Sequence, residues 1–266
     1  MPRPRTVWLF ALARSGSSIA AYASAAPWNL PVADEVLGPW DRTGEPYRYP
    51  PSQASLVELF KAEGHALTPA VVDAARATLA EIRGSAPTVI SKWPHLRPPP
   101  DEWRRAFAGE PAVYLIRNPL HRLNSLHRRG WTTSFGPKQD LDRYRQYARW
   151  WLEQPHRVSF DQFKADPRAF FTAVWTGWEF EFTDRDLDAA EKYARKHYHA
   201  SSKVVEGKPR GAVFSERRFE LPREAIDLYL GDPFIQEFMS TMQWSTDPAD
   251  YGFAPREPLH EPPAAR

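Results

Sequence analysis

The sequence predicts an α/β fold, a single domain over residues 1–266 in which helices flank a central parallel sheet. Seven apolar residues run without a break from Val7 to Ala13, which is typical of a strand buried on both faces of a parallel sheet. Later strand patterns alternate with helical patterns, as in a doubly wound sheet. The 266 residues are enough to bury a substantial core, and we find no internal repeat or domain boundary. A Pro-rich tail, expected to be loose, begins at about residue 247.

The apolar run leads directly into a short polar loop. It holds a cation, a glycine and hydroxyls: Arg14, Ser15, Gly16, Ser17 and Ser18. The small residues from Ile19 to Ala26 follow and are compatible with a helix. A strand, a loop and a helix in this order gather free backbone N–H groups and the positive end of a helix dipole at one point. With the hydroxyls and the guanidinium, they predict a receptor for a tetrahedral anion such as phosphate or sulfate.

Two other interpretations of this stretch stay open. A strand, turn and helix with serines at the cap also occurs as a plain structural element that binds nothing. A secretory signal is favoured by the basic start, Met1–Arg5, and by the small residues Ala23–Ala26, which resemble a cleavage site. Arg14 interrupts the apolar run and argues against a signal. We therefore favour the anion loop.

Composition excludes several kinds of site. Cysteine is absent, which excludes disulfides, thiolate metal sites and a thiol nucleophile, and is compatible with the cytoplasmic location that we expect. No run approaches the ~20 apolar residues that span a bilayer. A net charge of +2 is too small to indicate nucleic-acid binding by itself. Cations gather locally between Arg117 and Arg149, where Asp140 and Asp142 are the acids, and this field favours an anionic ligand.

The next elements follow from turn and cap signals. Pro27–Pro51 is rich in Pro, Gly and aromatic residues, which predicts a long ordered loop whose aromatic side chains either pack on the domain or wall a binding pocket. Thr68-Pro69 begins a helix that ends before Gly84. The other elements predicted up to residue 108 are a short helix over Ser55–Ala62, a β-branched strand over Thr88–Ser91 and a helix over Asp101–Ala108.

The second half continues the alternation. Ala112–Ile116 is a clear strand, and Asn118 with Pro119 predicts the start of a helix that runs to about Arg129. Asp140 is expected to cap the next helix, whose aromatic stripe (Tyr144, Tyr147, Trp150, Trp151) indicates a core face. A strand over Arg157–Phe160 and helices over Asp166–Trp175, Asp184–Tyr198 and Pro222–Leu230 complete the prediction.

Three predicted strands end in a cation. Ligands of an open parallel sheet bind beyond the carboxyl ends of its strands, so Arg14, Lys92 and Arg117 are expected to lie near one another. Three unpaired cations would repel, and a polyanionic ligand would relieve that repulsion. The sequence therefore predicts that the anion site lies at this edge.

The same residues resemble a known family. Arg14–Ser18 is similar to the Lys-Ser-Gly-Thr-Thr loop of sulfotransferases that use 3′-phosphoadenosine 5′-phosphosulfate (PAPS). Arg117-Asn118-Pro119 followed by Ser125 resembles that family's Arg-Asn/Asp-Pro…Ser element, with the same step from Arg to Ser. Val158–Phe163 and Asp166-Pro167 resemble its later strand and the segment after it. The order of the motifs along the chain is that of the family.

This resemblance implies a P-loop-NTPase-like sulfotransferase fold and roles for named residues. Arg14–Ser18 would bind the 5′-phosphosulfate, and Arg117 with Ser125 the 3′-phosphate. Lys92 matches the lysine that ends the family's next strand, and His95 is the first choice for the catalytic base. Arg210 and Gly211 resemble part of a stretch that closes over the 3′-phosphate. PAPS would be the co-substrate, with no metal.

The chain also departs from that pattern. Arginine at position 14 replaces a lysine and is rigid and bidentate, Ile19 stands where a tryptophan often stacks, and His95 lies three residues after Lys92 instead of two. The predicted acceptor is a small molecule or a glycan, with a wall from Trp28, Trp40, Tyr47, Tyr49 and the 130–137 loop. No nucleic acid beyond the nucleotide and no membrane span are expected, and a homodimer is left open.

Two other functions remain as alternatives. A small-molecule phosphotransferase would use the same anion loop, but should have a full P-loop lysine and an acidic metal ligand at a strand end, and neither is apparent. A non-catalytic anion- or nucleic-acid-binding module would need exposed aromatic residues beside cations. The helix with Arg143 and Arg149 beside Tyr147 and Trp150 could supply such a face if those rings are exposed.

Overall fold

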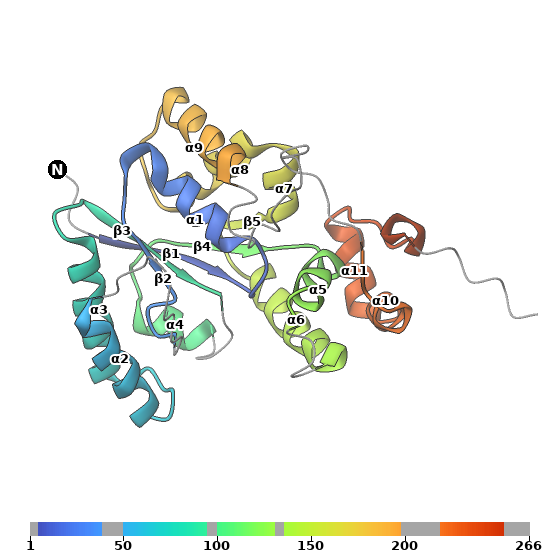
Figure 1. Cartoon of the computed structure of the whole chain (residues 1–266), viewed down its shortest axis with the longest axis horizontal. Helices are drawn as coiled ribbons and strands as arrows, with labels where there is room; N and C mark the ends of the chain where they lie inside the picture. Colours follow the sequence, from blue (N-terminus) through green and yellow to red (C-terminus); the bar gives the residue numbers. More distant parts are fainter. Residues whose placement is uncertain (1–4, 39–49, 95–99, 131–135, 198–218, 253–266) are drawn as a thin grey trace, which may run out of the picture. The chain divides into compact units, whose positions relative to one another are not determined.

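The computed structural model describes residues 5–38, 50–94, 100–130, 136–197 and 219–252 (Figure 1). The predicted Pro-rich tail lies in part outside these residues. Along the described part, strands alternate with helices as the sequence predicted.

Within the described ranges, five strands form one fully parallel sheet in the order β2-β3-β1-β4-β5. The strands are β1 (Arg5–Ala11), β2 (Val32–Asp34), β3 (Thr88–Trp93), β4 (Ala112–Ile116) and β5 (Arg157–Ser159). Val7 of the central strand is in register with Ile90 of β3, and Leu9 with Val113 of β4. The predicted parallel sheet with the apolar run at its centre is confirmed. Strand β2 is an addition to the prediction, because its three residues lie within the Pro- and Gly-rich stretch that predicts a loop.

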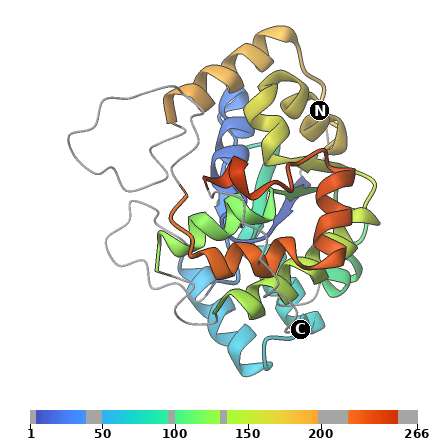
Figure 2. The ribbon, with the colours of Figure 1, turned by 90° about the vertical axis from the view of Figure 1, so that its right-hand side faces the viewer.

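Helices cover both faces of this sheet (Figure 1). On one face lie α1 (Ser17–Ala25), α7 (Phe160–Ala165), α8 (Pro167–Gly177) and α9 (Asp184–His197). On the other face lie α2 (Pro51–Ala62), α3 (Pro69–Arg83), α4 (Pro100–Ala106) and the last part of α6 (Gly136–Leu152). Helix α9 packs against α1 and α8, as both views show (Figures 1 and 2).

The central strand is apolar on both sides because it lies between two cores. Val7 and Leu9 belong to the core beneath α1 and α8, together with Phe163 and Trp175. Trp8 points to the opposite core, where its ring lies 4.8 Å from that of Trp103. Burial on both faces explains why β1 reads as a continuous apolar run instead of an alternating one.

The aromatic stripe of α6 is part of the core. Tyr147 and Trp151 are 1% and 5% exposed, and the Tyr147 hydroxyl lies 3.1 Å from the carbonyl oxygen of Phe10 and 3.0 Å from that of Leu115. Burial raises the pKa of Tyr147 well above its ordinary value, so this phenol stays neutral. A nucleic-acid face built on these rings is therefore excluded.

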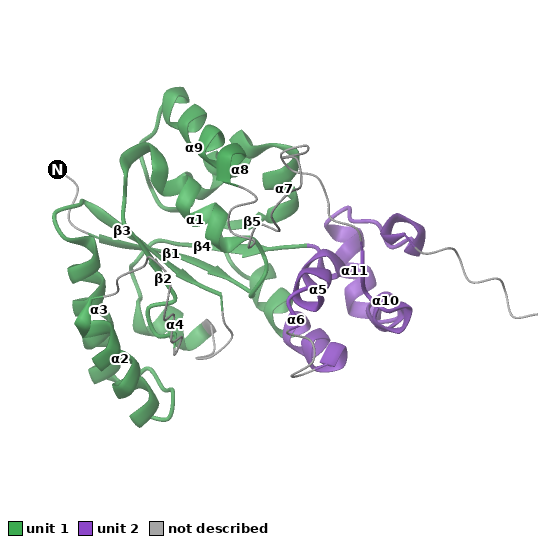
Figure 3. Cartoon of the chain, in the orientation of Figure 1, with its two compact units in different colours: residues 1–117, 146–215 green, residues 118–145, 216–266 purple. Residues whose placement is uncertain are grey.

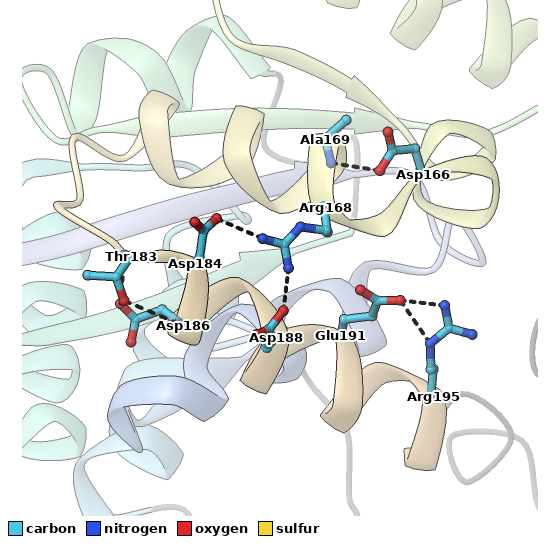
Figure 4. Close-up of polar contacts among 9 residues, drawn as sticks. All are labelled: Asp166, Arg168, Ala169, Thr183, Asp184, Asp186, Asp188, Glu191 and Arg195. Carbon is cyan, nitrogen blue, oxygen red and sulfur yellow. Dashed lines mark hydrogen bonds and ion pairs between the residues drawn. The ribbon is translucent and has the colours of Figure 1, made fainter.

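Helix α9 carries ion pairs on its outer surface (Figure 4). Arg168 at the start of α8 binds Asp184 at 2.7 Å and also Asp188, while Glu191 pairs with Arg195 one turn along α9. These groups are exposed, so each pair stabilises the helix only weakly.

The chain divides into two compact units (Figure 3): Met1–Arg117 with Gln146–Ser215, and Asn118–Arg145 with Glu216–Arg266. Unit 1 holds the sheet. Unit 2 holds α5 (Pro119–His127), the first part of α6, α10 (Arg223–Leu230), α11 (Pro233–Thr241) and a short 3-10 helix, η3 (Pro248–Tyr251). The single domain over residues 1–266 stays a prediction.

A buried ion pair holds unit 2 together. Both terminal nitrogens of Arg122 on α5 bind the carboxylate of Asp140 on α6, at 2.7 and 3.0 Å, and the Tyr229 hydroxyl of α10 donates to the same carboxylate at 2.7 Å. Burial lowers the pKa of Arg122, but the charge and hydrogen bonds of Asp140 more than offset this and leave the pKa raised. The prediction that Asp140 caps α6 is therefore wrong. That helix already begins at Gly136, and Asp140 is fully buried.

Candidate functional site

The loop between β1 and α1 has a backbone that few residues can adopt. Arg14 and Gly16 have φ angles of 69° and 83°, both in the left-handed region, and the Ser15 N–H donates to the Leu12 carbonyl at 3.1 Å. A Cβ atom at Gly16 would lie 2.1 Å from the ring of Phe160. A glycine is thus required at position 16 both by the backbone conformation and by the close packing of the Phe160 ring. A plain serine-rich turn would not need a glycine for either reason.

Two features of this loop would favour the binding of an anion. Gly16 is the N-cap of α1, and because a glycine has no side-chain oxygen, the first-turn N–H groups of the helix are left to water or to a ligand. The hydroxyl of Ser15 is buried, in a residue 1% exposed, and has no hydrogen-bond partner among the described residues. A buried hydroxyl without a partner is costly, so a bound ligand that supplied one would be stabilised.

Arg117 directly follows β4 and reaches the loop. Its guanidinium donates to the carbonyl oxygen of Arg14 at 3.0 Å and lies 5.1 Å from the centre of the Phe160 ring. One aromatic ring therefore contacts both Gly16 and Arg117. The structure confirms that these strand ends bring Arg117 and the Arg14–Ser18 loop together.

Lys92 near the end of β3 also reaches the loop, and its ammonium is buried. Its Nζ donates to the Ser18 hydroxyl at 3.0 Å and lies 2.5 Å from Asp34 and 3.4 Å from Glu35. The lysine side chain is 3% exposed. The prediction that strand-end cations gather at this edge is confirmed for Lys92 and Arg117, which both contact the loop, but the assumption that they are unpaired is wrong for Lys92, which has two carboxylates.

Asp34 and Glu35 are the site residues that sequence reasoning missed. They stand at the carboxyl end of β2, where Asp34 is in register with Lys92 and the Glu35 N–H donates to the Lys92 carbonyl at 3.0 Å. The sequence does show two apolar residues followed by two acids at Val32–Glu35, a change from apolar to polar like that at the other strand ends. A strand of three residues is too short to show a periodic pattern, so this signal did not identify it. The expectation that no strand ends in an acid is therefore wrong.

Part of the predicted acceptor wall has a different role. The ring of Trp28 lies 4.8 Å from that of Trp175 and 5.5 Å from that of Phe180. Trp28 therefore packs on the domain, which is the first of the two alternatives given for the aromatic residues of this loop. Trp40, Tyr47 and Tyr49 lie outside the described residues.

Unit 2 carries the rest of the Arg-Asn-Pro element. The Asn118 side chain accepts hydrogen bonds from the N–H groups of Leu120 and His121, which confirms it as the N-cap of α5, and donates to the Tyr251 hydroxyl at 3.2 Å. Ser125 lies in the same helix. Since Ser125 belongs to unit 2 and Arg117 to unit 1, their shared role at one phosphate stays a prediction.

Other predicted features fall outside this geometry. His95, Arg210 and Gly211 lie outside the described residues, so their roles stay predictions. The cationic field between Arg117 and Arg149 is partly neutralised, because Arg122 pairs with Asp140, Arg128 with Glu220 and Arg145 with Asp232.

Two kinds of feature are absent from the described residues. They contain no group of three or more His, Cys, Asp or Glu side chains that could hold a metal ion. Over the same part of the chain, no helix has both the length and the apolar character needed to cross a bilayer.

The sequence matches no known protein family and no curated protein. Among solved structures, the sulfotransferase domain of the Synechococcus olefin synthase matches with a TM-score of 0.53 and 15% identity, over 92% of this chain and 97% of that one. The sulfotransferase domain of the curacin biosynthetic pathway matches at 13% identity, over 92% of this chain and 99% of that one, with a TM-score of 0.46. A retinol dehydratase in complex with androsterone and the inactive cofactor PAP matches at 12% identity, over 90% of this chain and 82% of that one, with a TM-score of 0.48.

The Synechococcus domain is similar enough for a comparison of folds. The chain therefore has a sulfotransferase-like α/β fold, as the sequence predicted. At this identity the likeness extends to the fold and not to the reaction.

Proposed function

We propose that this chain transfers a sulfuryl group from PAPS to a hydroxyl or amine of a small-molecule or glycan acceptor. The observation that carries the proposal is the loop at the carboxyl end of β1, with its uncapped helix start and the buried, unpartnered Ser15 hydroxyl. Such a loop suits a tetrahedral anion, because N–H groups, hydroxyls and a helix dipole act on the same point.

The donor's charges have suitable partners at this edge. The Arg14–Ser18 loop would hold the 5′-phosphosulfate, and Arg117 would bind the 3′-phosphate together with Ser125. Arg117 is suited to this because its guanidinium already lies against the loop and can form two parallel hydrogen bonds with a phosphate. Arg210 and Gly211 are proposed to close over the same phosphate.

Sulfuryl transfer needs little covalent chemistry from the protein. It is an in-line displacement like phosphoryl transfer, and negative charge grows on the bridging oxygen as the bond to sulfur breaks. Donors that are already in position stabilise that charge without reorganisation. Lys92 is such a donor, since its ammonium is buried and already hydrogen-bonded to the loop residue Ser18.

A small-molecule phosphotransferase is the second candidate, and one observation favours it. Asp34 and Glu35 put two carboxylates at a strand end beside Ser18, where a P-loop enzyme holds its Mg²⁺ ligands. Against it, the loop has no lysine of its own, and Lys92 occupies both carboxylates. Dependence on Mg²⁺ separates the two candidates.

Calorimetry with 3′-phosphoadenosine 5′-phosphate (PAP) tests the proposal. We expect micromolar binding without Mg²⁺, and about 10- to 100-fold weaker binding for Arg117→Ala, because a charged hydrogen bond to a phosphate contributes about 1.5–3 kcal/mol. Arg168→Ala is the matched control, since Arg168 is bound to acids of α9 and should leave the affinity unchanged.

Two outcomes would contradict the proposal. If the wild-type chain fails to bind PAP at micromolar concentrations, or if Arg117→Ala binds it as tightly as the wild type, this edge is not a PAPS site. Tighter binding of a nucleoside triphosphate, present with Mg²⁺ and absent without it, would instead establish the phosphotransferase.

A further inference from the structure

A buried phenol joins the two strands that lead into the candidate site. The hydroxyl of Tyr147 on α6 lies 3.1 Å from the carbonyl oxygen of Phe10 on β1 and 3.0 Å from that of Leu115 on β4. A phenol has one hydrogen to donate, whereas a carbonyl oxygen has two lone pairs. Tyr147 therefore shares a single hydrogen between both strands and still leaves each carbonyl a lone pair for the sheet.

These contacts lie where the two strands separate. Ala11 and Leu115 are the last residues of β1 and β4 that are in register with each other. Three residues after Ala11 comes Arg14, the start of the polar loop, and two residues after Leu115 comes Arg117. The ends of a hydrogen-bonded element open most easily, so a donor that bridges both strands stabilises their spacing at the point where the site begins.

The opposite face of the sheet has a second brace. The Phe160 ring lies 2.1 Å from the place of a Cβ at Gly16, and its centre lies 5.1 Å from the guanidinium of Arg117. Phe160 belongs to the core beneath α1, whereas Tyr147 reaches the strands from α6 on the other face (Figure 1). The loop and Arg117 are thus positioned from both faces of the sheet, by a ring on one and by a phenol on the other.

Spacing matters at this edge because the two segments would bind opposite ends of one ligand. Under the proposed function, the loop holds the 5′-phosphosulfate and Arg117 the 3′-phosphate. The ribose between these two groups fixes the distance between them. A site whose halves already have that spacing binds both ends at a small cost in ordering, and two linked ends then bind far more tightly than either end alone.

From this geometry we propose that Tyr147 is a positioning residue that sets the spacing between the loop and Arg117 and so matches the site to a nucleotide with phosphates on both its 3′ and 5′ oxygens. The proposal rests on the proposed function. Tyr147 acts through the backbone, since its hydroxyl donates to the carbonyls of Phe10 and Leu115. Burial raises the pKa of this phenol well above its ordinary value, so the shared hydrogen is retained at neutral pH.

Tyr147→Phe tests this role, because it removes the hydroxyl and keeps the ring. Calorimetry with the full chain compares three ligands: PAP, adenosine 5′-phosphate and adenosine 3′-phosphate. We expect PAP to bind at least about 5-fold more weakly to the variant than to the wild type, while each monophosphate stays within about 2-fold. A single phosphate binds one segment, so the distance between the two segments does not enter its affinity.

Tyr229→Phe is the matched control. Tyr229 is likewise a fully buried tyrosine, but its hydroxyl donates to Asp140 of unit 2, at 2.7 Å, and not to a strand end. Both variants lose one buried hydroxyl, so thermal unfolding should show a loss of stability in each. The control should nevertheless bind all three ligands like the wild type, which separates a general loss of stability from a loss of spacing.

The outcomes separate this inference from the proposed function. If the wild type binds PAP at micromolar concentrations and Tyr147→Phe binds it equally well, the phenol does not set the spacing, and the proposed function stands. If Tyr147→Phe does not fold, or weakens all three ligands by the same factor, the phenol supports the fold as a whole and the inference is wrong. If the wild type does not bind PAP, the proposed function fails, and the role of Tyr147 fails with it.

Discussion

Among the residues that the structure describes, two buried cations are neutralised in different ways. In unit 2, Arg122 and Asp140 meet one to one, with two parallel hydrogen bonds, and Tyr229 satisfies the carboxylate further. In unit 1, Lys92 faces two carboxylates and a hydroxyl, at distances from 2.5 to 3.4 Å. The first arrangement joins one guanidinium to one carboxylate, whereas the second joins one ammonium to two carboxylates and a hydroxyl.

The difference shows that burial of a charge does not by itself identify a functional site. Both cations are almost fully inaccessible, with side chains 4% and 3% exposed. What separates them is their neighbours, because Lys92 touches the loop at the start of α1, whereas Arg122 lies among three helices. A charge pair shared between helices is typical of a structural role, whereas a charged cluster beside a strand-end loop is typical of a functional site.

The largest effect should come from breaking the one-to-one pair. Asp140→Asn leaves Arg122 charged and buried without a counter-charge, which should lower the free energy of unfolding by about 3–5 kcal/mol. Asp34→Asn should cost less than about 2 kcal/mol, because Glu35 still neutralises Lys92. Chemical denaturation of both variants measures the contrast, and equal losses would remove the distinction between the two clusters.

A smaller effect should come from the loop beside Lys92. Gly16→Ala should destabilise the fold by about 1–3 kcal/mol, because alanine is strained at φ 83° and its Cβ would meet Phe160. It should also weaken PAP binding, since the loop has to shift.

Gly64→Ala is the control for that variant. Gly64 also has positive φ, 63°, but nothing lies within 4 Å of an added Cβ. Its loss of stability should reflect the backbone strain alone and leave PAP binding unchanged. If both variants behave alike in denaturation and calorimetry, the contact with Phe160 does not shape the loop.

The smallest effect concerns another acid, Glu110, which lies further from its cation, Arg76, than the acids of the two clusters lie from theirs. The Trp8 N–H donates to the Glu110 carboxylate at 2.5 Å, and the half-exposed Arg76 lies 3.6 Å from it, and both contacts favour the ionised form. The burial of Glu110 outweighs them and raises its pKa above the ordinary value of 4.5. A raised pKa in the folded state gives stability that is complete below the ordinary pKa and is lost as the pH rises through the raised one.

Urea denaturation of the wild type and Glu110→Gln at a series of pH values measures this loss. The free energy of unfolding of the wild type, relative to the variant, should fall as the pH rises from about 4.5 and then level off. A difference that does not change with pH, or that rises, would mean that pairing with Arg76 outweighs burial.

The elements that were predicted well are those whose pattern repeats along the chain. The unbroken apolar run of β1, the cap and proline at Asn118 and the stripe of α6 are local signals, and each appears in the structure. The strand that was missed is short and has no period. It is the three-residue β2, which is a strand because it pairs with β3.

The sequence by itself determined the parallel sheet, the glycine-containing loop at the end of its central strand and the cations at the strand ends. These follow from the order of apolar runs, glycine and charge along the chain, because parallel strands bring their carboxyl ends to one edge. Only the tertiary structure decided the partners of those cations. Asp34 and Glu35 are distant from Lys92 in sequence, and Asp140 from Arg122 and Tyr229, so each pairing depends on how strands and helices pack.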